Sequence, residues 1–208
     1  MNNEFLQKLV NLLEYNQKFP KYQSERRIDI FFNLFLPDII QWHFGEEFHV
    51  DIIIPELPIK KDENNQSTNL DYFAICNDQH KGFLIELKTD VNSCRVNQFE
   101  SYLKVQSDGF DNIKTGIRQI YHATSKQYRE KYAYLTSLLE PERTNQDLLL
   151  EILYILPAAG KKKLAKVTRI QGQPVHFITL ESLADLEVNG DFKDEWAVIK
   201  SLNLICAH

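Results

Sequence analysis

The stretches Asn69-Leu-Asp-Tyr-Phe-Ala-Ile-Cys76 and Gly82-Phe-Leu-Ile-Glu-Leu-Lys88 decide the fold of this chain. Both are short apolar runs of the kind that forms buried strands, and the polar segment that joins them is typical of a turn. Three charged residues, Asp71, Glu86 and Lys88, belong to these runs. A charge in a buried strand is costly unless it is paired or bound to a metal. These residues are therefore the first candidates for a functional site.

The alternation of side chains along a strand predicts that the three charges share a face. In the second run, Leu84, Glu86 and Lys88 point the same way. In an antiparallel hairpin that closes around residues 79–80, Asp71 lies opposite Lys88, and a slip of two residues places it opposite Glu86. Either register brings the three together, whereas a slip of one residue moves Asp71 to the other face.

Two carboxylates beside a lysine suit divalent-metal chemistry on phosphodiesters. Mg²⁺ prefers a few carboxylate oxygens plus water, and it can neutralise a phosphate and activate a water molecule. Asp71 and Glu86 would supply the carboxylates, and the backbone carbonyl of Leu87 could add a neutral oxygen. Lys88 could orient the attacking water, assist its deprotonation or stabilise charge on the phosphate. We expect Mg²⁺ or Mn²⁺ as the cofactor, and the three roles of Lys88 stay open.

Asp71, fourteen intervening positions and Glu86-Leu-Lys88 resemble the motif of the PD-(D/E)xK, or restriction-endonuclease-like, nuclease superfamily. Leu-Asp replaces the signature Pro-Asp and leaves the metal-binding Asp intact. The resemblance implies an α/β fold with an αβββαβ core, a central mixed sheet flanked by helices. It implies one domain over residues 1–208, with its core at about 24–180. It also implies a metal-dependent nuclease that acts on DNA, either as an endonuclease or as an exonuclease, and it leaves a homodimer open.

Residues on two predicted helices extend this resemblance. Gln98-Phe-Glu-Ser-Tyr102 is similar to the QxxxY element of the exonuclease-like branch, which implies that Gln98 and Tyr102 position the substrate or the catalytic Lys. Residues four apart share a helix face, so both could reach the site. Glu25 resembles the helical Glu that many members use as a metal ligand or support, although Glu14 also lies on a predicted helix.

Plainer interpretations stand beside these. Glu86 and Lys88 could form a cross-strand ion pair, Gln98 could face solvent beside a half-buried Tyr102, and Glu25 could favour the helix dipole. The only other such tripeptide, Asp191-Phe-Lys193, follows Asn-Gly in a polar, turn-like setting without an apolar strand. The rival function is a catalytically inactive module of the same fold that binds nucleic acid or a protein partner.

The rest of the chain predicts an alternation of helices and strands. Helices are expected at 3–15, from Ser24 towards Pro37, and at 97–106, 111–123, 125–139 and 193–206. Strands are expected at 49–60, where Pro55 and Pro58 suggest an edge or a break, and at 148–156 and 175–180.

Composition limits the class of protein. The chain has 208 residues, a net charge of −5 and three cysteines without zinc spacing. This charge argues against a broadly basic nucleic-acid coat but permits a local basic groove. The absence of a signal peptide, of a membrane span and of a disulfide framework predicts a cytoplasmic protein. We expect a solvated loop at the basic cluster, or alternatively a surface that binds the phosphates of a nucleic acid. The cluster consists of Lys161, Lys162, Lys163, Lys166 and Arg169.

Overall fold

The structure is a computed structural model that describes residues 25–60, 67–168, 174–188 and 192–197, with isolated positions at 8, 11, 12, 15 and 200. For residues 25–28 and 166–168 it describes the backbone alone. Most of the predicted helices at 3–15 and 193–206, the predicted cap Ser24, and both Glu14 and Arg169 therefore lie outside the described residues. Residues 193–197 are helical, as expected.

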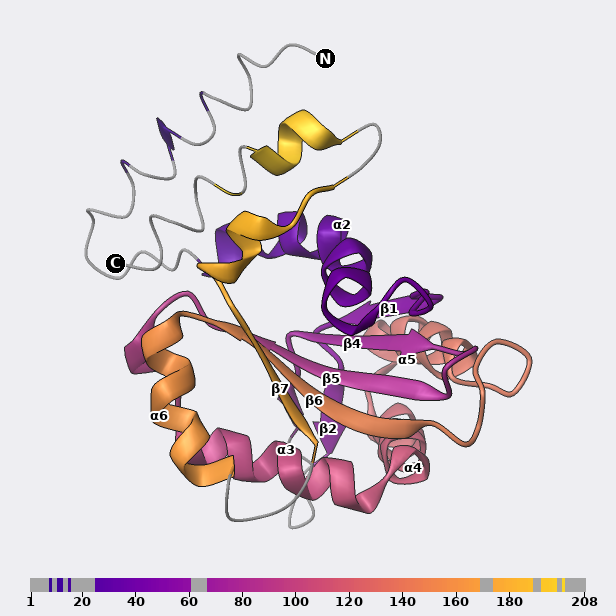
Figure 1. The fold of residues 1–208 in the computed structure, drawn as a ribbon. Helices are drawn as coiled ribbons and strands as arrows, with labels where there is room; N and C mark the ends of the chain where they lie inside the picture. The colour runs from indigo at the N-terminus through magenta and orange to yellow at the C-terminus, as the bar shows by residue number, and fades with distance from the viewer. Residues whose placement is uncertain are drawn as a thin grey trace.

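The centre of the molecule is a five-stranded mixed sheet (Figure 1). In spatial order its strands are β1 (Ile52–Pro55), β4 (Tyr72–Cys76), β5 (Lys81–Leu87), β6 (Leu149–Leu156) and β7 (Val175–Thr179). The first three strands in this order pair antiparallel, and β5, β6 and β7 pair parallel. The predicted mixed α/β fold with a central sheet is confirmed at this level.

Helices cover both faces of the sheet (Figure 1). α2 (Glu25–Phe44) covers one face, and α3 (Val96–Asp108) and α4 (Phe110–Ala123) cover the other. α5 (Lys126–Leu138) packs on α4, and α6 (Ala158–Thr168) lies against β7. The described residues also form two short 3₁₀ helices, η1 (Val91–Ser93) and η2 (Ser182–Asp185). No described helix has both the length and the apolar character needed to cross a membrane.

The strand alternation builds one core on each side of the sheet. Phe83, Ile85 and Leu87 of β5 pack with residues of α2, whereas Leu84 packs on the opposite side with residues of α3 and α4. Gly82 allows this second core to close, because a Cβ there would lie 2.9 Å from Leu150 Cδ2 and 3.0 Å from the Phe73 ring.

The hairpin predicted from the two apolar runs is confirmed. Tyr72 pairs with Ile85 and Cys76 with Lys81, so the strands are joined by four residues. One residue before Tyr72, this register places Asp71 beside Glu86. Of the two registers that the sequence allowed, the structure therefore has the one with Asp71 opposite Glu86 rather than opposite Lys88.

Helices predicted at 97–106, 111–123 and 125–139 are confirmed as α3, α4 and α5, and the strands at 148–156 and 175–180 as β6 and β7. Two other expectations, the end of the helix that begins near Ser24 and the loop at Lys161–Lys163, are wrong. α2 continues through Pro37 to Phe44, because the buried side chains of Ile39 and Ile40 outweigh the local cost of proline. The edge or break suggested by Pro55 and Pro58 is confirmed, because the segment 49–60 divides into the edge strand β1 and a separate strand, β2.

The division of 49–60 creates a second, two-stranded sheet. β2 (Pro58–Lys60) pairs antiparallel with β3 (Ser67–Asn69) and packs against α4. The polar composition of β3 hid it from a pattern search for apolar strands.

The expected loop at Lys161–Lys163 is wrong, because these residues lie on α6. Ala and Lys are good helix formers, and the buried Leu164 anchors this helix to the core beneath the exposed lysines.

Candidate active site

The charged hairpin residues meet at one corner of the sheet, where β4 begins and β5 ends. Glu86 is 1% exposed and Lys88 6% exposed, whereas the Asp71 side chain is 31% exposed. Lys88 continues the pairing of β5 with β6, since its backbone N–H donates to Ile155 O at 2.8 Å. The sequence-predicted triad is therefore assembled at the paired ends of β4 and β5.

Protein groups hold both carboxylate oxygens of Glu86. The Lys88 ammonium pairs with Oε1, Gln98 Nε2 donates to the same oxygen at 2.6 Å, and the Tyr102 hydroxyl donates to Oε2. Gln98 Nε2 also donates to the Tyr102 hydroxyl oxygen at 3.0 Å. Burial, and after it the negative charge of Asp71, raises the pKa of Glu86 to about 7. Burial and the charge of Glu86 raise the pKa of Tyr102 above its usual range.

Asp71 occupies the more open side of the site. Its Oδ2 accepts a hydrogen bond from Leu87 N at 2.7 Å and lies 4.0 Å from Lys88 Nζ. Burial raises the pKa of Asp71, while Lys88 and the Leu87 N–H oppose that rise. The lysine ammonium thus stands between the two carboxylates.

The spacing of Gln98 and Tyr102 on α3 explains how both reach Glu86. The residues are one helical turn apart on the face of α3 that packs on the sheet. The sequence predicted their approach to the site, and the structure brings them to Glu86. The ordinary arrangement of a solvent-facing Gln98 is contradicted by its hydrogen bond to Glu86.

Glu25 begins α2, but its side chain lies outside the described residues. Two other carboxylates that sequence reasoning missed, Glu56 and Asp29, contribute to the raised pKa of Asp71. Asp29 lies one helical turn after Glu25, and its carbonyl accepts a hydrogen bond from the Tyr72 hydroxyl at 2.6 Å. The helical spacing from Glu25 was the signal that could have identified Asp29.

Tyr154 on β6 is the second missed feature of the site. It pairs with Glu86 across the parallel strands, and its ring centre lies 6.2 Å from that of Tyr102. Its buried hydroxyl has no hydrogen-bond partner among the described residues. Burial and the charge of Glu86 raise the pKa of Tyr154 above its usual range. Nothing in its apolar strand distinguished this tyrosine from a core residue.

The donors at this corner suit a hard cation in their chemistry. Asp71 and Glu86 offer carboxylate oxygens, and Mg²⁺ binds one or two such groups while keeping several waters. The described residues contain no group of three or more His, Cys, Asp or Glu side chains that could hold a metal ion. A cation shared by Asp71 and Glu86 would compete with the Lys88 ammonium for Glu86 Oε1.

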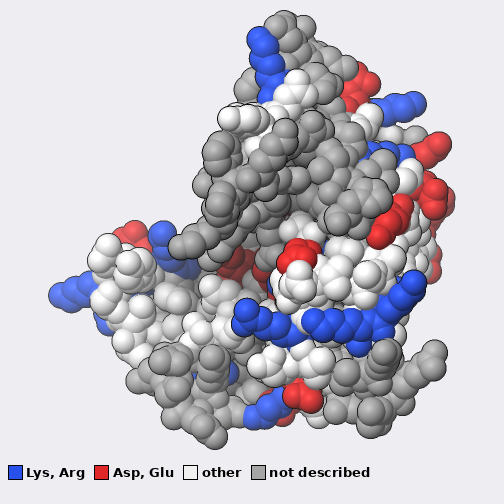
Figure 2. Space-filling model, turned by 90° about the vertical axis from the view of Figure 1, so that its left-hand side faces the viewer, with Lys and Arg blue, Asp and Glu red and all other residues white. Residues whose placement is uncertain are grey.

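Basic side chains lie on α6, the helix that follows β6 at the same edge of the sheet as this corner. α6 follows β6, whose carboxyl end lies at the same edge of the sheet as that of β5, and Lys161, Lys162 and Lys163 are exposed on it. Figure 2 shows Lys and Arg side chains in a band across the side of the molecule on which α6 lies.

Comparison of the chain with protein-family models, with curated proteins and with solved structures found no significant match.

Proposed function

We propose that this protein is a metal-dependent nuclease of the PD-(D/E)xK type that hydrolyses phosphodiester bonds in DNA. The observation that carries the proposal is the buried Glu86, paired with Lys88, fixed by Gln98 and Tyr102, and placed next to the more open Asp71. Three charged groups on one face, supported by two further polar side chains, form an arrangement that a solvent-exposed ion pair does not require.

The order of elements supports the same proposal. α2, β1, β4, β5, α3 and β6 occur in the order expected of an αβββαβ core, with β2 and β3 inserted between β1 and β4, and α4 and α5 inserted between α3 and β6. A central mixed sheet with helices on both faces agrees with that core.

Each residue then has a defined task. A bound Mg²⁺ or Mn²⁺ would supply charge neutralisation at the phosphate and a more acidic water. Asp71 and Glu86, with the Leu87 carbonyl, are the groups to hold it. Lys88 presents an ammonium group at the carboxylates, where it can stabilise charge on a phosphate oxygen or hold a water molecule. Gln98 and Tyr102 fix the orientation of Glu86.

One observation favours the rival function, a catalytically inactive module. Both oxygens of Glu86 already have protein partners, so its charge is satisfied without a metal. Calorimetric titration with Mn²⁺ separates the two functions. The nuclease requires binding that is lost in Asp71→Asn and Glu86→Gln variants, whereas the module requires no such binding.

The direct test is a cleavage panel of linear, circular and single-stranded DNA, and RNA, with Mg²⁺ or Mn²⁺. We expect cleavage of DNA by the parent protein and none by Lys88→Ala. Circular substrates separate an endonuclease from an exonuclease. Equal cleavage by the parent and by Lys88→Ala would reject the catalytic assignment.

A further inference from the structure

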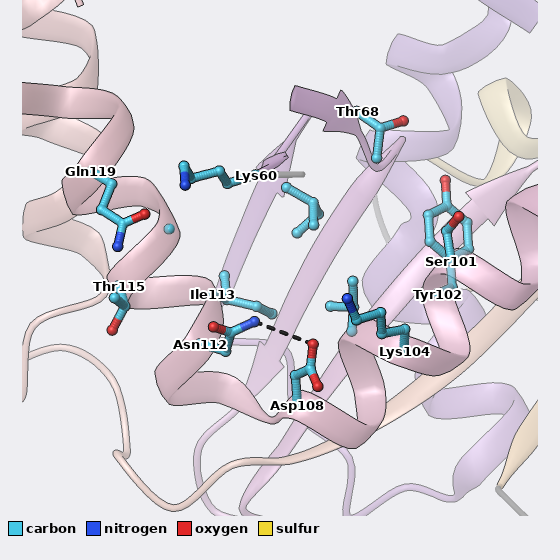
Figure 3. A pocket seen from close by; sticks show the side chains of 13 residues that line it. Lys60, Thr68, Ser101, Tyr102, Lys104, Asp108, Asn112, Ile113, Thr115 and Gln119 are labelled. Atoms are coloured by element: carbon cyan, nitrogen blue, oxygen red, sulfur yellow. Dashed lines mark hydrogen bonds between the residues drawn. The ribbon is translucent and has the colours of Figure 1, made fainter. Parts of the chain in front are cut away.

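A cavity of about 510 Å³ adjoins the candidate active site (Figure 3). Its walls are α3, α4 and the β2–β3 hairpin. Two of these walls continue into the site. Tyr102 and its neighbour Ser101 line the cavity from α3, and Thr68 lines it from β3, three residues before Asp71.

The lining of this cavity combines apolar side chains with basic and neutral polar groups. Ile59, Val105 and Ile113 contribute apolar surface. Lys60 and Lys104 contribute positive charge from β2 and α3 respectively. Among the described residues of the lining, Asp108 is the only acidic one, and its Oδ2 accepts a hydrogen bond from Asn112 at 3.4 Å. The described lining thus carries two lysines and one aspartate, a positive excess that contrasts with the net charge of −5 for the whole chain.

We propose that this cavity binds a nucleotide of a single-stranded DNA segment that leads away from the scissile phosphate. A volume of roughly 300–1,000 Å³ is usual for small-ligand sites, and the cavity falls in that range. The apolar side chains of the lining can pack against the face of an unpaired base, and the ammonium groups of Lys60 and Lys104 can bind the phosphates on either side of that base. A base that is paired within a duplex has no unstacked face to present.

The positions of the lining side chains define the path of the strand across the cavity. Figure 3 shows Ser101 and Tyr102 at one side of the cavity and Lys60 with Gln119 at the other, with Asp108 and Asn112 along a third side. A strand whose reacting phosphate lies at Asp71 and Glu86 therefore passes Tyr102 and continues towards Lys60. This inference rests on the proposed function for the location of the reacting phosphate.

The test measures fluorescence anisotropy of a labelled single-stranded oligonucleotide in EDTA, where no metal-dependent cleavage occurs. The charge variant is Lys60→Gln/Lys104→Gln, and its matched control is Lys126→Gln/Lys131→Gln on α5, which does not line the cavity. We expect about a tenfold loss of affinity at low salt for the cavity variant only, with the slope of log K against log salt reduced by roughly 1.4 for two lost phosphate contacts.

A second pair of variants tests whether the single strand needs the open volume of the cavity, and it leaves the charge of the protein unchanged. Ser101→Trp places a bulky ring at the cavity, and Ser137→Trp is the control. Both serines are exposed on helices and donate to a carbonyl about one turn earlier, Ser101 to Asn97 O at 3.0 Å and Ser137 to Tyr134 O at 2.7 Å. We expect Ser101→Trp alone to weaken binding of the single strand. Circular dichroism checks that each variant folds.

The inference is overturned if the parent does not bind the single strand, if cavity and control variants bind alike, or if binding of a blunt duplex weakens as much as binding of the single strand. Cleavage with Mg²⁺ is scored separately. If the parent cleaves DNA and the cavity variants bind the single strand normally, the cavity is rejected as a binding site and the nuclease function is retained. If the parent cleaves no DNA but its binding of the single strand is weakened by the cavity variants, the nuclease function is rejected and the binding site is retained.

Discussion

At the scale of single residues, two neighbouring tyrosines differ in what their hydroxyl groups do. The Tyr102 hydroxyl donates to Glu86, whereas the Tyr154 hydroxyl is buried without a hydrogen-bond partner in the described part of the chain. Both rings are almost completely buried. Removing the hydroxyl from each by mutation to phenylalanine should therefore have opposite effects.

Tyr102→Phe should lower both stability and activity. It leaves Glu86 Oε2 without its donor, and an unsatisfied buried acceptor costs about 1–3 kcal/mol in the free energy of unfolding. Loss of that donor should also reduce the cleavage rate roughly tenfold or more, because Glu86 is less firmly oriented. Urea denaturation and initial cleavage rates measure the two effects. Unchanged stability and unchanged activity would reject a supporting role for Tyr102.

Tyr154→Phe should raise the free energy of unfolding by about 1 kcal/mol, since it removes a buried polar atom that lacks a partner. The ring and its packing stay in place, so the variant is also the matched control for Tyr102→Phe. A loss of stability in the same urea experiment would mean that the Tyr154 hydroxyl makes a hydrogen bond in solution.

The site residues differed in how well the sequence revealed them. Strand alternation was sufficient to put Asp71, Glu86 and Lys88 together, and helical spacing was sufficient for Gln98 and Tyr102, because local geometry fixes both patterns. Tyr154 was missed because it approaches Glu86 only through the parallel pairing of β5 with β6, and such long-range pairing leaves no local pattern.

At the scale of elements, an ionic cluster ties three adjacent strands together on the opposite face of the sheet. Glu151 of β6 pairs with Lys81 of β5, and its Oε2 lies 2.8 Å from Nε2 of His176 on β7. The hydrogen bond with His176 lowers the pKa of Glu151, and Lys81 adds to this effect. A lowered carboxyl pKa stabilises the fold above the ordinary value of 4.5, and this stabilisation is lost as the pH falls through the lower folded-state pKa.

The parent protein should therefore lose more stability on acidification than a Glu151→Gln variant. We expect a difference on the order of 1 kcal/mol between neutral pH and about pH 3, measured by denaturant unfolding at both pH values. Glu130→Gln, at an exposed position on α5, is the control and should behave like the parent. An equal loss of stability in the parent and in Glu151→Gln would show that the cluster does not contribute.

The elements that the sequence did not predict share one physical cause. The helix over Ala158–Thr168 and the strand β3 lack a strong apolar pattern, and tertiary contacts stabilise them. β4, β5 and β6 were predictable because they are buried along most of their length and therefore apolar.

At the scale of the whole molecule, the fold builds the charged corner from two neighbouring strands and a helix that packs on them. β5 provides Glu86 and leads into Lys88, α3 provides Gln98 and Tyr102, and the turn before β4 provides Asp71. We propose that this corner catalyses metal-dependent cleavage of DNA. Lys88 is the residue whose removal tests it, and Lys114 offers a matched control, since it is also buried, at 8% exposure, and is paired with Asp111 at 2.6 Å.

The most direct measurement is the initial rate at which the purified protein cleaves end-labelled DNA with Mg²⁺, compared among the parent, Lys88→Ala and Lys114→Ala. Circular dichroism confirms that each protein is folded under the conditions of the assay. We predict that the parent and Lys114→Ala cleave, that EDTA stops both, and that Lys88→Ala does not cleave. Cleavage by folded Lys88→Ala at the parent's rate, or no cleavage by the parent on any DNA, would contradict the claim.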